Sequence, residues 1–138
     1  MCSIMCTSKN IKDYDDVNYY LKFRGPDETS VVKDEVNNFT FIFNLLSMTG
    51  EYTLQPFHDD DIISLFNGEI YNYKEFGDYK SDGYCINDLY KEYGVDFVKK
   101  LDGEFAILLM DFKKDLILMV ILDAQHTEQL LIKLTTGM

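Results

Sequence analysis

Two almost wholly apolar segments, EFAILLMDF (104–112) and LILMVIL (116–122), constrain the fold of this chain more than any other feature. Each has the length of a strand, and the polar tripeptide Lys113-Lys114-Asp115 between them predicts an antiparallel hairpin. A strand that is apolar on both faces has to be covered on both faces. Together with the helices predicted below, the hairpin indicates an α+β protein in which sheets pack together and helices lie outside.

Three more strands are predicted upstream of this hairpin. The segment FTFIFNLLSM (39–48) is aromatic, apolar and uncharged, which is typical of a buried strand. Residues 62–66 and 70–73 are two further strand candidates on either side of Asn67-Gly68. Because Asn-Gly is a favoured two-residue turn, these two segments are predicted to form a second hairpin.

Helical patterns occur in four places. Apolar residues at helical spacing predict a helix over 86–94 that stops at its glycine, and a second short helix over 95–103 that ends at Gly103. Two weaker patterns also predict helices: 11–23, which ends before an Arg-Gly-Pro-Asp turn, and 123–138, which is amphipathic.

Composition excludes several classes of function. The chain has 138 residues, 46% of them hydrophobic, which is enough for the core of one domain over 1–138. A net charge of −11 disfavours nucleic acid and anionic membrane surfaces as partners. We find no apolar run of about 18 residues and no signal-peptide pattern, and the three cysteines (Cys2, Cys6 and Cys85) suit a reducing compartment, so a cytoplasmic protein is expected.

Cys2 is the candidate nucleophile. A small residue at position two permits removal of Met1, after which Cys2 carries both a thiol and an α-amino group. An α-amino group with a pKa of about 7.7–8.0 can act as a general base without a histidine. The plain alternative is an early residue in a frayed end. His58 and His126 have no supporting motif, and His58 precedes three aspartates that read as a solvated acidic loop rather than a cation site.

The tripeptide Asn67-Gly68-Glu69 has two interpretations. The first is a hairpin turn and nothing more. The second is an oxyanion hole, in which the Asn67 side-chain amide and the Gly68 N–H aim at one point while Glu69 holds a cationic ammonium group.

Six short segments occur in an order and spacing that resemble a known family. They are Cys2, RGPD (24–27), QP (55–56), NGEIYNY (67–73), SDG (81–83) and LDGEFA (101–106). The set resembles the class II glutamine amidotransferase domain of the asparagine synthetase type, clearly over about 2–117, with 118–138 diverged. The resemblance implies an amino-terminal-nucleophile hydrolase fold, a four-layer αββα sandwich of two antiparallel sheets, possibly truncated. It also implies hydrolysis of glutamine to glutamate and ammonia, without a cofactor or a metal.

The resemblance assigns roles to residues that match the family. Cys2 matches the nucleophile, and Asn67 with Gly68 matches the oxyanion hole. The residues matching the substrate-binding positions are Leu46, Met48, Glu69 and Asp82, with Arg24 and Asp27 as possible support. The carboxylates of Glu69 and Asp82 suit the glutamine ammonium group, because charge-assisted hydrogen bonds are the strong ones.

The chain also departs from the family pattern. Ser3 follows the nucleophile where Gly is expected, Tyr84 replaces an acid, and the tail diverges after Asp123. Leu45 stands where the family has an Arg that pairs with the glutamine α-carboxylate. No nucleotide-binding Ser-Gly-Gly-Leu-Asp-Ser motif is present, so a separate synthetase subunit or domain is the expected ammonia acceptor. The alternative is a catalytically impaired remnant that binds a partner.

Overall fold

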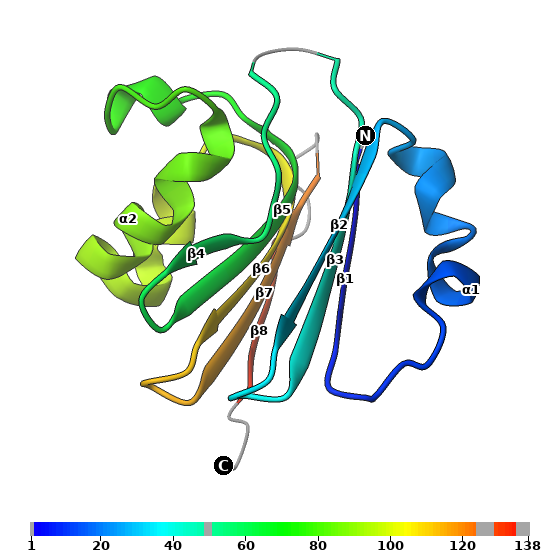
Figure 1. The fold of residues 1–138 in the computed structure, drawn as a ribbon. Coiled ribbons are helices and arrows are strands. Elements are labelled where there is room, and N and C mark those ends of the chain that lie inside the picture. The colour runs from blue at the N-terminus through cyan, green and yellow to red at the C-terminus, as the bar shows by residue number, and fades with distance from the viewer. Residues whose placement is uncertain (1, 49–50, 124–128, 135–138) are drawn as a thin grey trace. The chain divides into compact units, whose positions relative to one another are not determined.

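The computed structural model describes residues 2–48, 51–123 and 129–134, the last segment as backbone only. The chain divides into two compact units, Met1–Pro56 and Phe57–Met138. Each unit contains one antiparallel sheet (Figure 1).

The first unit holds a three-stranded sheet in the order β1-β3-β2. Its strands are β1 (Ser3–Thr7), β2 (Glu28–Asp34) and β3 (Phe39–Leu45). The prediction of a buried strand is confirmed, because Phe41, Ile42 and Phe43 in the central strand are all 1% exposed or less. The strand ends at Leu45, so the last three residues of the predicted segment lie beyond it.

The helix predicted over 11–23 forms two short pieces. They are α1 (Tyr14–Asn18) and the 3₁₀ helix η1 (Leu21–Arg24), which lie on one face of the three-stranded sheet (Figure 1). The Asp13 side chain caps α1 by accepting hydrogen bonds from the backbone N–H groups of Asp15 and Asp16. The next segment, 25–27, is irregular and leads into β2, in agreement with the predicted turn.

The second unit holds a five-stranded antiparallel sheet in the order β4-β5-β6-β7-β8. Its strands are β4 (Phe57–Asp59), β5 (Ile62–Ile70), β6 (Gly103–Asp111), β7 (Leu116–Leu122) and β8 (Gln129–Leu134). The apolar hairpin is confirmed as β6 and β7. Helix α2 (Cys85–Tyr93) covers one face of the sheet and encloses a core with Phe66, Ile70 and Phe105 (Figure 1). The helix ends at Gly94, whose φ of 63° suits glycine.

The predicted hairpin turn at Asn67-Gly68 is wrong. Strand β5 runs through both residues without interruption, and each faces a residue of β6, Asn67 opposite Ala106 and Gly68 opposite Phe105. The reason is that β6 pairs with β5 along its whole length, so ladder pairing overrides the local turn preference. The segment after Ile70 forms a turn and the 3₁₀ helix η2 (Tyr73–Glu75) rather than a strand.

Two helix predictions also need correction. The segment 95–103 is the 3₁₀ helix η4 (Gly94–Lys100), and Gly103 begins β6 instead of ending a helix. The predicted C-terminal helix is wrong where residues are described, because Gln129–Leu134 pairs with β7 as a strand. Pairing with β7 extends the sheet by one strand; the rest of the predicted helix, 124–128 and 135–138, lies outside the described residues.

The predicted fold class is confirmed. Two antiparallel sheets with helices make an α+β protein and agree with the sandwich of the amino-terminal-nucleophile hydrolases. Within the described residues, no helix is both long enough and apolar enough to cross a membrane.

Candidate functional site

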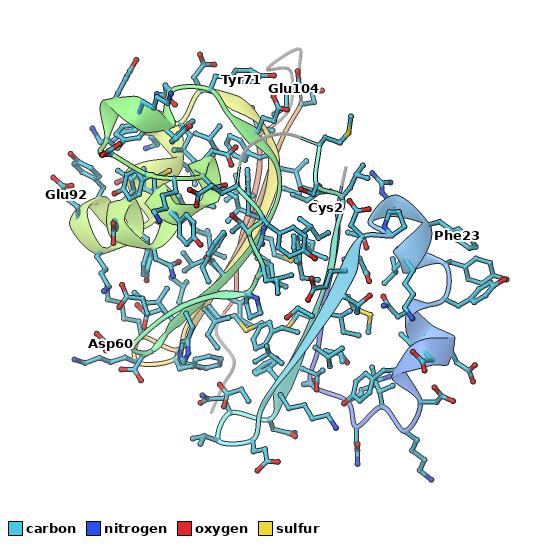
Figure 2. The ribbon with its side chains drawn as sticks, turned by 45° about the horizontal axis from the view of Figure 1, so that its top comes forward. Cys2, Phe23, Asp60, Tyr71, Glu92 and Glu104 are labelled. Atoms are coloured by element: carbon cyan, nitrogen blue, oxygen red, sulfur yellow. The ribbon has the colours of Figure 1, made fainter. Side chains whose placement is uncertain are left out.

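Cys2 lies at the start of β1, against the end of β3. The register pairs Ser3 with Asn44, so the residue before Ser3 meets the segment that follows Asn44. The Leu46 N–H donates to Cys2 Sγ over 3.4 Å, and Sγ lies 3.9 Å from the Leu46 carbonyl oxygen. The half-buried thiol (Figure 2) is therefore held against the backbone at the end of β3, and Leu46, predicted to bind substrate, is its neighbour.

Asp27 forms hydrogen bonds with the same end of β3. Its N–H donates to the Leu45 carbonyl over 3.0 Å, and its Oδ2 accepts from the Ser47 N–H over 2.7 Å. Gly25 makes this close approach possible, because a Cβ there would lie 2.2 Å from the Asn44 carbonyl oxygen. The Arg-Gly-Pro-Asp segment therefore stabilises the end of β3 that contacts Cys2. Its sequence predicted a turn but not this contact.

Two other predicted residues of this unit lie on its surface. Arg24 ends η1 with an exposed side chain. Met48 is 76% exposed, three residues beyond the end of β3. Their roles in binding substrate stay predictions.

A buried polar cluster behind Cys2 escaped the sequence analysis. Asn44 is completely buried and hydrogen-bonds with Ser3, Asn18 and Thr29. A lone Asn inside the apolar run FTFIFNLL was the available signal. A polar side chain in such a strand needs partners, and those partners come from three other elements.

Asn67, Gly68 and Glu69 occupy the last part of β5 in the second unit. Side chains alternate along a strand, and Phe66 and Ile70 belong to the core beneath α2. Asn67 and Glu69 therefore lie on the opposite face of the sheet. Gly68 has a φ of 139°, and a Cβ there would lie 2.1 Å from the Glu104 carbonyl oxygen.

Asp82 is tied to the same end of β5. Its Oδ2 accepts from the Ile70 N–H over 2.8 Å and its Oδ1 from the Gly83 N–H over 3.0 Å. Asp82 is therefore bonded to the backbone of the residue that follows Glu69. That the carboxylates of Glu69 and Asp82 act as a pair stays a prediction. The Ser81 O–H also donates to Asp82 Oδ1 over 3.3 Å. A carboxylate has about four acceptor positions, so these three bonds leave about one for an ammonium donor.

Glu104 adds a third carboxylate that the sequence analysis did not identify. It lies directly opposite Glu69 in the β5–β6 register. The Tyr71 O–H donates to Glu104 Oε1 over 3.0 Å (Figure 2). The hydrogen bond to Glu104, then burial, then the charges of Glu104, Glu69 and Asp102 raise the pKa of Tyr71 above its usual value. This end of the sheet is strongly negative.

The acidic segment after His58 forms part of the β4–β5 hairpin. Asp59 in β4 makes an ion pair with Lys91 of α2, and Asp60 takes a φ of 51° in the turn. Among the described residues no group of three or more His, Cys, Asp or Glu side chains is arranged to hold a metal ion. His126 lies outside the described residues.

The predicted site residues fall into two groups, one in each unit. Cys2, Leu46 and Asp27 lie together in the first unit, and Asn67 to Glu69 lie with Asp82 in the second. The first unit thus contributes a half-buried thiol, and the second contributes the Asn67 amide on the strand that carries Glu69 opposite Glu104.

Comparison with known proteins identifies the class. A family model described as glutamine amidotransferase domain matches residues 1–123, and the chain belongs to this family. The domain is of the asparagine synthetase type. Asparagine synthetase 2 of Bacillus subtilis is 32% identical over 126 residues, which cover 83% of this chain and 16% of the relative.

Two other relatives match shorter parts. Asparagine synthetase 1 of Arabidopsis thaliana is 37% identical over 101 residues, covering 66% of this chain and 17% of the relative. Amidase chyE of Penicillium rubens is 37% identical over 84 residues, covering 53% of this chain and 12% of the relative. The chain thus spans at most about a fifth of the length of these curated relatives.

Proposed function

We propose that the chain is a glutaminase domain that hydrolyses the side-chain amide of glutamine to glutamate and ammonia, with Cys2 as nucleophile. Membership of the glutamine amidotransferase family supports the reaction class. The observation that carries the assignment of Cys2 is its contact with Leu46, whose N–H lies 3.4 Å from Sγ. A thiol held by backbone at a strand end has a fixed position for attack, as nucleophilic catalysis requires.

The reaction proceeds in two halves. After removal of Met1, the α-amino group of Cys2 takes the thiol proton while Sγ forms a bond to the amide carbon. The negative oxygen of the tetrahedral intermediate accepts hydrogen bonds from the Asn67 side-chain amide and the Gly68 N–H. The ammonium returns the proton to the leaving nitrogen, the C–N bond breaks and ammonia departs. Water then cleaves the thioester by the same route and releases glutamate.

The proposed site recognises glutamine through charged side chains and through backbone groups. The carboxylates of Glu69 and Asp82 bind the α-ammonium group of glutamine, and Glu69 follows Gly68 directly on β5. The backbone at Leu46 and Met48 also contacts the bound substrate. Arg24 binds the α-carboxylate in place of the Arg that Leu45 replaces, and Asp27 supports the strand end through its bond to Ser47.

The ammonia is proposed to pass to an acceptor reaction like that of an asparagine synthetase. The relatives from Bacillus subtilis and Arabidopsis thaliana are named glutamine-hydrolysing asparagine synthetases, and each is about six times as long as the segment matched here. The synthetase activity would therefore belong to another domain or subunit.

Glutamine-dependent release of glutamate and ammonia tests the proposal. Cys2→Ser should abolish turnover, and Asn67→Ala should lower kcat by about 10²–10³, as expected for loss of one oxyanion donor. Asn72→Ala is the matched control, because Asn72 lies in the same tract and its side chain hydrogen-bonds with the backbone of Lys100 and Asp102. Turnover that survives Asn67→Ala unchanged would remove Asn67 from the mechanism.

The mass of the amino terminus of the purified protein is a second test. A chain that begins at Cys2 has the α-amino group that the mechanism uses. A chain that retains Met1 and still hydrolyses glutamine at full rate would rule out the terminal amine as the base.

A second candidate function is a catalytically impaired domain that binds a partner. Leu45 motivates it, because a leucine that is 6% exposed stands where the resemblance leads us to expect a carboxylate-binding Arg. Loss of a charged hydrogen bond of about 1.5–3 kcal/mol weakens binding roughly ten- to a hundredfold. Titration calorimetry with glutamine separates the two: the glutaminase binds glutamine and turns it over, whereas the impaired domain does neither.

A further inference from the structure

Asn44 is the centre of a closed set of buried hydrogen bonds. It lies in the central strand of its sheet, opposite Ser3 of β1 on one side and Thr29 of β2 on the other. Its Nδ2 donates to Ser3 Oγ over 2.9 Å and to Asn18 Oδ1 over 2.8 Å. Its Oδ1 accepts from Asn18 Nδ2 over 2.9 Å and from Thr29 Oγ1 over 2.8 Å.

These four bonds use the full capacity of the Asn44 side chain, which has two donors and two acceptor lone pairs. Asn44 is 0% exposed and Asn18 is 2% exposed, so water does not replace a lost partner without rearrangement. Buried polar sets that are completely satisfied favour one arrangement of the elements they join. The elements joined here are β1, α1, β2 and β3.

The hydrogen bonds of Asn44 are connected to Cys2, the proposed nucleophile, in two ways. Ser3, the residue after Cys2, accepts from Asn44 and donates its own O–H to the Leu21 carbonyl over 2.9 Å. Asn44 also precedes the Leu45-Leu46 segment whose backbone contacts Cys2 Sγ. The buried Asn44 amide thus holds two segments in place. One is the start of β1, next to Cys2, and the other is the end of β3, which the thiol contacts.

We propose that Asn44 is a positioning residue for Cys2, acting through Ser3 and through the end of β3. This inference rests on the proposed glutaminase function and deepens it. The hydroxyl of Ser3, which stands where the resemblance leads us to expect Gly, belongs to this arrangement because a glycine would leave one Asn44 donor without its acceptor.

The rate of Cys2 alkylation by iodoacetamide tests the inference without glutamine. Ser3→Ala removes the link between Asn44 and β1 with little risk to folding, and Asn44→Ala removes the whole set. Release of the thiol from its contact with the Leu46 N–H should slow alkylation of Cys2 by about three- to tenfold in both variants. The same variants should lower kcat by at least this factor with KM within about twofold.

Asn87→Ala is the matched control. Asn87 is also a buried asparagine, 6% exposed, and accepts a hydrogen bond of 2.7 Å from Ser64 in the second unit. Its loss should lower stability in a similar way but leave the rate of Cys2 alkylation unchanged. A purely structural role for Asn44 predicts the same result for Asn44→Ala and Asn87→Ala.

The outcomes are distinguishable. If folded Ser3→Ala and Asn44→Ala proteins react with iodoacetamide at the rate of the unaltered protein, the positioning role is wrong, whatever the glutaminase does. If Cys2→Ser retains turnover, the proposed function fails even when the alkylation rates behave as expected. Slower alkylation with lower kcat, and neither change in Asn87→Ala, supports both.

Discussion

Gly68, a proposed donor of the oxyanion hole, occupies a position that does not accommodate a side chain. Its φ of 139° disfavours any L side chain, and an added Cβ would lie 2.1 Å from the backbone oxygen of Glu104. The positive φ and the close approach to Glu104 both occur where β5 pairs with β6. Strand pairing therefore requires a glycine here, as does the proposed chemistry.

Three glycine-to-alanine variants separate these effects. Gly94 has a φ of 63° with open space around it, and Gly103 has a Cβ clash with the Glu69 oxygen at 2.1 Å without positive φ. Gly94→Ala and Gly103→Ala should each cost about 1–3 kcal/mol, and Gly68→Ala at least about 4 kcal/mol because it combines both. Urea denaturation checks this order. A Gly68→Ala protein as stable as Gly94→Ala would contradict the backbone described here.

The cysteines should differ in reactivity. Burial raises the pKa of both Cys6 and Cys85 to about 12, so at pH 8 both remain protonated thiols in the folded chain. Iodoacetamide at pH 8 should therefore modify Cys2 first, and peptide mass spectrometry can locate the adduct. Equal labelling of all three cysteines in the native state, as in urea, would contradict the raised pKa values of Cys6 and Cys85.

Sequence reasoning reached the motif residues but not the residues that support them. Cys2, Asn67 and Asp82 lie in short segments with recognisable chemistry. Asn44 and Glu104 gain their meaning only from register, because Asn44 faces Ser3 and Glu104 faces Glu69 across strand pairs. The separation of these partners by 41 and 35 positions hides such pairs from any local pattern.

At the scale of elements, Asp82 connects the 3₁₀ helix η3 (Asp82–Tyr84) to the end of β5. Its Oδ2 accepts from the Ile70 N–H over 2.8 Å. Asp82→Ala should expose this N–H, lower stability by about 1–3 kcal/mol and speed hydrogen exchange at Ile70. Asp82→Asn keeps an acceptor for one of the two N–H groups, those of Ile70 and Gly83, and loses the other. It should therefore cost less stability than Asp82→Ala while it weakens glutamine binding through loss of charge.

Asp78→Ala is the control, because Asp78 is exposed a few residues upstream. It should change neither the hydrogen exchange of Ile70 nor the KM for glutamine. If Asp82→Asn leaves KM unchanged while Asp82→Ala destabilises the protein, Asp82 is a structural residue only.

Elements with strong apolar patterns were predicted and those decided by pairing were not. The β6–β7 hairpin and α2 follow directly from their sequences. Strand β5 passes through Asn67-Gly68 because β6 pairs with it throughout, and β8 pairs with β7 although its sequence also fits an amphipathic helix. Tertiary pairing decided both cases against local preference.

At the scale of the whole molecule, thiol and phenol groups with raised pKa values predict loss of stability in alkali. Burial is the main cause for Cys6, Cys85 and Tyr79, each raised to about 12, and Asp88 adds to it for Tyr79. The folded state keeps these groups neutral, whereas the unfolded state ionises them near pH 9–10. The stability that they contribute is therefore complete below about pH 9 and falls as pH rises towards 12.

Thermal unfolding between pH 8 and pH 11 measures this effect. The midpoint should fall steadily above about pH 9, and Cys85→Ala should flatten the fall relative to the unaltered protein. A midpoint independent of pH over this range would contradict the burial of these groups.

The central claim is that Cys2 attacks glutamine and carries the glutamyl group as a thioester. Acid quenching of the protein during turnover, followed by peptide mass spectrometry, tests it most directly. We predict a glutamyl adduct on the peptide that begins with Cys2, absent from Cys2→Ser and from protein without glutamine. Glutamine hydrolysis that continues in Cys2→Ser, or an adduct on Cys6 or Cys85 instead, would contradict the account.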